Sequence, residues 1–128
     1  MNLARLAVAV VGILLPYIAR IPGGAAWVEQ YTDVGVVGFL FFGAFNAIPW
    51  GSIVGFSFLF RRPGPLLIPC VLGFGFLGWA HYNVDLASDA QASLLLLVVP
   101  ILAMVPIVVG GVLGYVLDRR LRRHDKPA

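Results

Sequence analysis

The chain has 128 residues, of which 60% are hydrophobic and only 12% are charged. A soluble domain carries about 25% charged residues, so the composition excludes an ordinary soluble globular domain. The net charge of +3 does not indicate nucleic-acid binding, because the few basic residues lie in short segments between long apolar runs. We therefore expect an all-α integral membrane protein whose four transmembrane helices form a kinked, irregular bundle with short loops.

Three breaks rich in proline, glycine or polar residues separate the four apolar segments. The first contains Pro22-Gly23-Gly24, the second is Arg61-Arg62-Pro63-Gly64-Pro65, and the third is a polar loop that begins at His81. Prolines inside the first, second and fourth segments predict a kink in each helix. The expected spans form one transmembrane domain at about 3–21, 34–60, 66–82 and 94–117, followed by a basic cytoplasmic tail at 118–128.

A cleaved signal peptide is the alternative for the first segment. Arg5 would precede its apolar region, and Gly24-Ala25-Ala26 would supply the small residues of a cleavage site. Against this interpretation, the apolar stretch continues beyond residue 16, and Arg20 and Pro22 intervene before the small residues. We therefore retain this segment as the first span.

The distribution of arginines predicts the orientation of the chain. With four spans, Arg20 lies on one side of the membrane together with Glu29, Asp33, Asp85 and Asp89. The opposite side carries nearly all the basic residues: Arg5, Arg61, Arg62, Arg119, Arg120, Arg122, Arg123 and Lys126. The positive-inside rule then places both termini in the cytoplasm of a multi-pass protein of the plasma or inner membrane.

The stretch GFGFLG has the Gly73-x-Gly75-x-x-Gly78 spacing of a dinucleotide-binding loop. That loop functions between a strand and the N-terminus of a helix, where the backbone approaches a pyrophosphate. Here the glycines lie in the middle of an expected span and are flanked by phenylalanine, leucine and tryptophan. We therefore expect no nucleotide and no other cofactor.

Glycine spacing in the spans instead predicts close helix packing. Small residues four positions apart allow helix backbones to approach each other in lipid. Two stretches have this pattern, in the second and fourth spans, and a looser pair lies in the third: Gly51 with Gly55, Gly110 with Gly114, and Gly75 with Gly78. The pattern leaves open whether these contacts form within one chain or between chains.

Three side chains of the second span form a polar stripe at helical spacing, namely Asn46, Trp50 and Ser57. Polar groups inside a membrane often line a path or bind a ligand. The alternative, which we favour, is structural: Asn46 makes one interhelical hydrogen bond, and Trp50 fills a gap.

His81, Asp85 and Asp89 are spaced four apart and could form a metal-binding face on a continuous helix. The stretch Ser88-Asp89-Ala90-Gln91 argues against continuity, because it fits a capping box that starts a new helix. We therefore expect no metal, and the three residues remain weak candidates for a metal or enzyme site at the extracytoplasmic rim.

Basic residues of the tail could hold anionic lipid headgroups, and Asp118 and Arg122 could pair if the helix continues. The headgroup candidates are Arg119, Arg120, Arg122 and Arg123. Otherwise the tail serves only to fix the topology.

The sequence shows many packing motifs and no catalytic constellation. We therefore expect a non-catalytic membrane protein that acts through helix association, with membrane lipids around it. It would be an accessory subunit of a larger complex or a homo-oligomer. The first alternative is a small oligomeric channel or facilitator for a neutral or weakly polar solute, lined by Asn46, Trp50 and Ser57. The second is the rim site at His81, Asp85 and Asp89.

Overall fold

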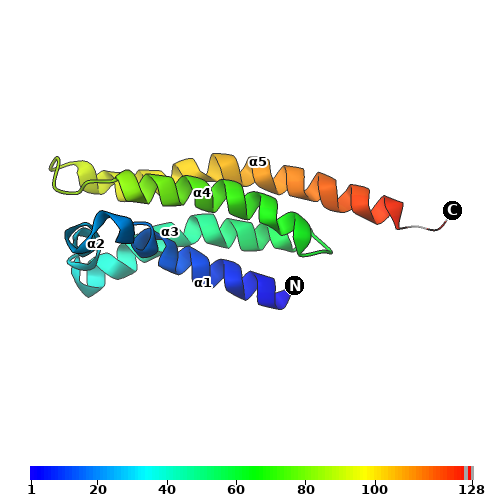
Figure 1. Ribbon diagram of the computed structural model, residues 1–128, viewed down its shortest axis with the longest axis horizontal. Coiled ribbons are helices and arrows are strands. Elements are labelled where there is room, and N and C mark those ends of the chain that lie inside the picture. Colours follow the sequence, from blue (N-terminus) through cyan, green and yellow to red (C-terminus); the bar gives the residue numbers. More distant parts are fainter. Residues whose placement is uncertain (126, 128) are drawn as a thin grey trace.

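A computed structural model describes residues 1–125 and 127 of the chain (Figure 1). The described residues form helices and contain no strand, and four of the helical segments are long and apolar enough to cross a membrane. The expected all-α fold with four candidate spans is thereby confirmed. The long helices are α1 (Asn2–Ile18), α3 (Gly35–Ser57), α4 (Leu67–Asn83) and α5 (Leu95–His124), and a short helix α2 (Ala25–Thr32) follows α1.

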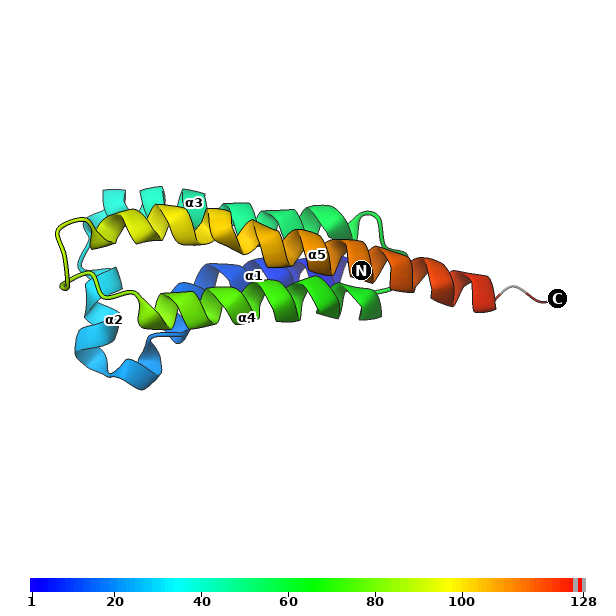
Figure 2. The same cartoon turned by 90° about the horizontal axis from the view of Figure 1, so that it is seen from above.

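The four long helices run alternately up and down in an elongated bundle (Figures 1 and 2). Helix α1 packs against α3 and α4, and α5 packs against the same two helices from the other side. Four hydrophobic core residues are no more than 1% exposed: Ile53, Leu77, Ala103 and Ile107. The bundle therefore has one continuous core to which all the long helices except α1 contribute such residues.

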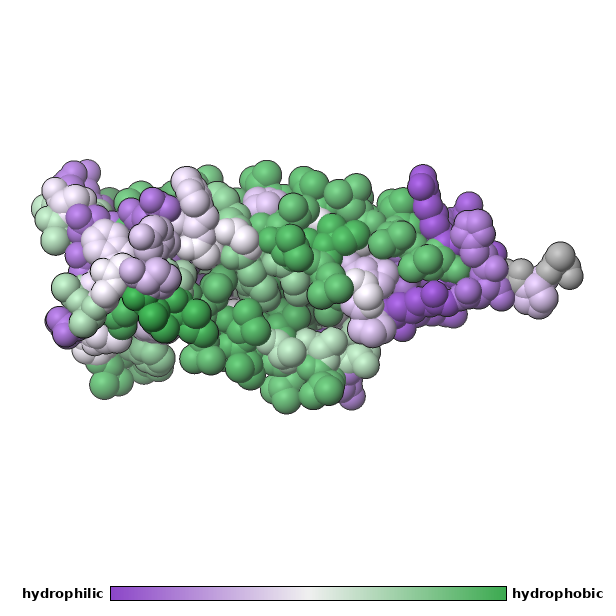
Figure 3. Space-filling view, in the orientation of Figure 1, coloured by the Kyte–Doolittle hydropathy of each residue, from purple (hydrophilic) through white to green (hydrophobic). Residues whose placement is uncertain are grey.

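The outer surface of the bundle is apolar along most of its length. Figure 3 shows a broad hydrophobic band, with hydrophilic residues gathered at the two ends. Large apolar side chains on every long helix are exposed, including Leu3, Val37, Trp79 and Val105. A soluble protein would not expose so continuous an apolar surface, whereas lipid tails solvate it.

The ends of the bundle differ in composition. One end, the arginine end, holds the start of α1, the connection between α3 and α4, and the end of α5. The opposite end, the α2 end, holds a 3₁₀ turn at Ile21–Gly23, helix α2 and the loop between α4 and α5. Helix α5 projects beyond the other helices at the arginine end (Figure 2). Two residues of the expected tail, 126 and 128, lie outside the described residues.

The predicted capping box at Ser88 is wrong. Helix α5 begins at Leu95, after a 3₁₀ turn at Ala92–Leu94. The Ser88 hydroxyl donates to the Asp85 carbonyl at 2.8 Å, and the Gln91 N–H donates to Asp89 Oδ1 at 3.0 Å. Short-range bonds of this kind offer the backbone an alternative to helix, so these residues close turns instead of starting α5.

Candidate functional site

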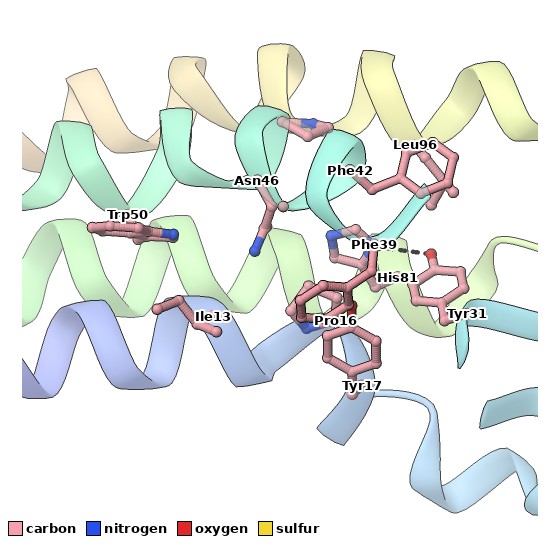
Figure 4. A pocket seen from close by; sticks show the side chains of 12 residues that line it. Ile13, Pro16, Tyr17, Tyr31, Phe39, Phe42, Asn46, Trp50, His81 and Leu96 are labelled. Atoms are coloured by element: carbon pink, nitrogen blue, oxygen red, sulfur yellow. Dashed lines mark hydrogen bonds between the residues drawn. The ribbon is translucent and has the colours of Figure 1, made fainter. Parts of the chain in front are cut away.

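A cavity of about 230 Å³ lies between the long helices in the half of the bundle nearer the α2 end (Figure 4). Its wall is mainly apolar and aromatic, with side chains from all four long helices and Tyr31 from α2. Phe39, Phe42 and Trp50 form much of the wall on the α3 side. Besides the tyrosine hydroxyl groups, the polar side chains that line the cavity are those of Asn46 and His81. A mainly apolar lining with few polar groups is typical of small-molecule binding sites, and the volume is below the roughly 300–1,000 Å³ of drug-sized sites.

Asn46 forms a hydrogen bond to an unpaired backbone carbonyl of the neighbouring helix α1. Pro16 lies inside α1 and has no N–H, so the carbonyl four residues earlier, that of Gly12, lacks its helical donor. The Asn46 side chain donates Nδ2–H to this carbonyl at 2.8 Å. The predicted interhelical hydrogen bond of Asn46 is therefore confirmed. It satisfies a backbone group that lipid could not.

Trp50 closes the cavity toward the arginine end. A Cβ added at Gly12 would lie 2.3 Å from the Trp50 Cβ, so only a glycine leaves room for this side chain. Beyond Trp50 the interior is filled by core side chains, and Ile53 and Ile107 are fully buried there. The cavity therefore ends at Trp50 and does not run through the bundle.

Ser57 lies at the arginine end, apart from the cavity. Its side chain is fully buried, and its hydroxyl accepts a hydrogen bond from Arg5 Nε at 2.7 Å. The Arg5 guanidinium also lies over the Phe58 ring, 3.8 Å from its centroid. The predicted polar stripe is thus divided: Asn46 and Trp50 line the cavity, whereas Ser57 fixes the start of α1 against the end of α3.

The Tyr31–His81 pair carries the polar chemistry of the cavity. Both side chains are buried, and the Tyr31 hydroxyl lies 2.9 Å from His81 Nδ1. Burial raises the pKa of Tyr31, so the hydroxyl is protonated, and it is placed to donate a hydrogen bond to Nδ1. We assign His81 the neutral tautomer that accepts at Nδ1 and carries its hydrogen on Nε2. His81 Nε2 is buried and has no hydrogen-bond partner among the described residues, which leaves a donor for a ligand.

Arg20 caps the C-terminus of α4 beside this pair. Its side chain is fully buried. Nη1 donates to the carbonyls of His81 and Val84 at 2.8 and 2.5 Å, and Nε donates to the Trp27 carbonyl at 2.7 Å. A cation is favoured at a helix C-terminus, where the last carbonyls lack helical donors. The carbonyl of His81 is thus fixed directly by Arg20.

Helix α2 completes the environment of Arg20. The guanidinium lies between the rings of Trp27 and Tyr31, 4.3 and 4.0 Å from their centroids. Gln30 Oε1 accepts from Arg20 Nη2 at 2.8 Å, and Gln30 Nε2 donates to Asp85 at 3.0 Å. Cation–π contacts and neutral acceptors therefore surround a buried charge, and Gln30 links it by hydrogen bonds to the carboxylate of Asp85.

The rim candidates do not converge on a metal site. Helix α4 ends at Asn83, so His81, Asp85 and Asp89 do not share one helical face. His81 faces the cavity, and the two aspartates accept hydrogen bonds within the loop. Among residues 1–125 and 127, no group of three His, Cys, Asp or Glu side chains is placed to hold a metal ion.

The packing glycines fall into two classes. A Cβ added at Gly110 would lie 2.6 Å from Pro69 Cα, and one at Gly114 would lie 2.7 Å from the Pro65 carbonyl oxygen. These two glycines therefore allow α5 to pack against the start of α4 within the chain. Gly78 lies near Leu15, but a Cβ at the remaining three would meet no described atom within 4 Å: Gly51, Gly55 and Gly75.

The arginines of the tail lie on the last turns of α5, which remains helical as far as His124. The predicted pair forms, with Arg122 Nε 3.1 Å from Asp118 Oδ2. Three of the four headgroup candidates line an open depression together with the α3–α4 connection, and Arg120 does not line it.

Sequence reasoning missed the cap formed by Arg20 and the pairing of Tyr31 with His81. Arg20 had one signal, since it is the single basic residue assigned to its side of the membrane. The hydrogen-bond partner of Asn46 also had a signal in the sequence, because Pro16 leaves the carbonyl of Gly12, four residues earlier, without its helical donor. The Tyr31 contact depends on where α2 folds back and has no local signal.

Comparisons with known proteins find no matching family model, no curated protein with significant similarity and no solved structure with a significant match. The functional argument therefore rests on the geometry of the cavity.

Proposed function

We propose that the protein binds a small lipid-soluble molecule in the aromatic cavity and is not an enzyme. The observation that carries this proposal is His81, a lining residue of the cavity whose buried Nε2 has no hydrogen-bond partner among the described residues. A buried donor left unsatisfied costs about 1–3 kcal/mol, and a ligand acceptor would remove that cost. The ligand class is therefore a compact, mainly apolar molecule with one acceptor oxygen, such as an aromatic ketone.

A groove on the side of the bundle supports entry of this ligand from the lipid. The groove lies between α1 and the start of α3 and includes Leu14 and Val36. It shares three residues with the cavity: Ile13, Tyr17 and Phe39. All three are apolar or aromatic, so a lipid-soluble ligand could pass between them without crossing a charged surface. This access route suits a binding protein, and a facilitator would need a further path beyond Trp50.

The arginine distribution supports an orientation with the arginine end in the cytoplasm. The cavity would then lie in the extracytoplasmic half of a plasma or inner membrane. The buried prolines of α1, α3 and α5 would kink these helices around it, because each removes a helical hydrogen bond: Pro16, Pro49 and Pro100.

Binding of acetophenone and ethylbenzene to the purified protein in detergent tests the proposal. These probes have similar size, and only acetophenone has a carbonyl acceptor. We expect saturable binding of both and about fivefold tighter binding of acetophenone, since one hydrogen bond contributes about 1 kcal/mol. In His81→Phe the preference for acetophenone should disappear. Calorimetric titration measures both affinities.

A matched pair of leucine variants locates the binding. Gly43 lines the cavity, and a Cβ there meets no described atom within 4 Å, so Gly43→Leu should occupy the site without disturbing the fold. Gly75→Leu adds the same side chain on α4, at a residue that also meets open space but does not line the cavity. Equal affinity of acetophenone for the two variants would overturn the proposal.

We also propose association through α3, as an oligomer or within a larger complex. The specific observation is that Gly51 and Gly55 leave open space on the outside of the bundle, so their small size serves no contact within the described chain. Small residues spaced in this way let a second helix approach closely.

For this second proposal, we expect Gly51→Leu to shift the protein toward a lower oligomeric state in native mass spectrometry. Gly75→Leu is the control, because Gly75 also meets open space but lies on α4. A wild-type protein that is monomeric when extracted gently, or an unchanged assembly in Gly51→Leu, would contradict association through this face.

A further inference from the structure

The arginine end contains an open depression of about 850 Å³ formed by two segments distant in sequence. Arg61 and Arg62 come from the connection between α3 and α4, whereas the other lining residues belong to α5 or follow it. Those residues are Tyr115, Arg119, Arg122, Arg123 and Asp125. The fold thus brings five guanidinium groups to one concave surface.

Asp118 fixes the geometry of this surface. Its carboxylate is fully buried and accepts hydrogen bonds from the backbone N–H groups of Arg61 and Arg62, at 3.3 and 3.2 Å. The same carboxylate pairs with Arg122. One buried acid therefore ties the α3–α4 connection to α5 through backbone N–H groups, and the side chains of both loop arginines line the depression.

The depression has a surplus of positive charge. Five arginines line it, and two carboxylates lie beside them. Asp118 is buried and pairs with Arg122, and Asp125 pairs with Arg62. Planar guanidinium groups bind phosphate oxygens through paired hydrogen bonds, and a tyrosine hydroxyl can add a donor. The chemistry matches a phosphate group better than a carboxylate, because a phosphate offers more acceptor oxygens to converging donors.

The position of the depression favours a lipid source for that phosphate. The candidate span that contains α5 has 33 residues, about 50 Å of helix, which exceeds the roughly 30 Å of a hydrocarbon core. The arginine end of α5 therefore emerges where lipid headgroups lie, and Figure 3 shows hydrophilic residues gathered there. The geometry points to a specific phosphate-binding site, which the phosphate of an anionic lipid headgroup occupies.

Native mass spectrometry with added phosphatidic acid tests this site. We expect one tightly bound phosphatidic acid and much weaker binding of oleate, an anionic lipid that lacks phosphate. An arginine near the surface contributes about 1 kcal/mol, so Arg61→Gln and Arg119→Gln should each weaken binding about fivefold. Arg120→Gln removes the same charge from the same helix outside the depression and should change the affinity less than twofold.

The outcomes separate the sources of the phosphate. Competition by millimolar inorganic phosphate would support the site but assign it to a soluble ligand. Equal losses in Arg61→Gln and Arg120→Gln, or equal binding of oleate and phosphatidic acid, would overturn the proposal, because both would indicate unspecific attraction by surface charge. Neither cavity binding nor the oligomeric state enters this measurement, so its failure is distinct from failure of the proposed function.

Discussion

Arg20→Met is expected to destabilise the protein by at least about 3 kcal/mol. The substitution keeps an unbranched apolar stem but removes the donors to two buried carbonyls, those of His81 and Val84. Each buried acceptor left without a partner costs about 1–3 kcal/mol. The Trp27 carbonyl loses its side-chain donor as well, Gln30 Oε1 keeps only the Leu86 N–H, and the stacking of the cation on two aromatic rings is lost.

Unfolding by a denaturing detergent, followed by tryptophan fluorescence, measures this effect. Arg120→Met is the control, since Arg120 is an exposed arginine on α5, and its free energy of unfolding should change by less than about 0.5 kcal/mol. Arg20→Lys should give an intermediate loss, because an ammonium keeps the charge but lacks the planar set of donors. Arg20→Met as stable as the control would show that the cap contributes nothing.

The candidate spans could be predicted from the sequence because hydrophobic length is a local property. Apolar segments long enough to cross a bilayer appear directly in the sequence, and the structure has four candidate spans. Helix ends were less predictable. Ser88 and Gln91 fit a capping box, yet short hydrogen bonds to Asp85 and Asp89 hold them in turns. Both arrangements satisfy the same groups, and only the surrounding fold selects one of them.

The cavity was only partly predictable. Asn46 could be singled out as a polar group in an apolar segment, and its bond to a neighbouring helix follows from the cost of leaving it unpaired. Tyr31 and His81 are 50 residues apart, and they meet only because α2 folds back against the end of α4. Nothing local in the sequence encodes that contact, which depends on how the helices pack.

The glycine motifs show the same limit in a form that experiment can address. Gly51-x-x-x-Gly55 and Gly110-x-x-x-Gly114 are identical as patterns, but the rotation of each helix in the bundle decides what each glycine faces. Gly110 lies against the backbone of α4, and Gly51 faces open space. The same substitution in the two motifs should therefore have opposite effects on stability.

Gly110→Ala is expected to destabilise the protein by about 1–3 kcal/mol, as overpacking of a close contact does. The added Cβ would lie 2.6 Å from Pro69 Cα and 2.9 Å from Pro69 N. Both atoms belong to the backbone, so no side-chain rotation relieves the clash, and α4 and α5 must separate. Thermal unfolding in mild detergent, followed by far-UV circular dichroism, measures the loss.

Gly51→Ala is the matched control. Alanine is a better helix former than glycine by about 0.5–1 kcal/mol, and the new methyl group at this position meets open space. Its thermal stability should equal or exceed that of the wild type, although the same helix gain is available to Gly110→Ala. A loss in Gly51→Ala as large as that in Gly110→Ala would mean that α3 also packs closely through this face, and that association contributes to stability under the conditions of the measurement.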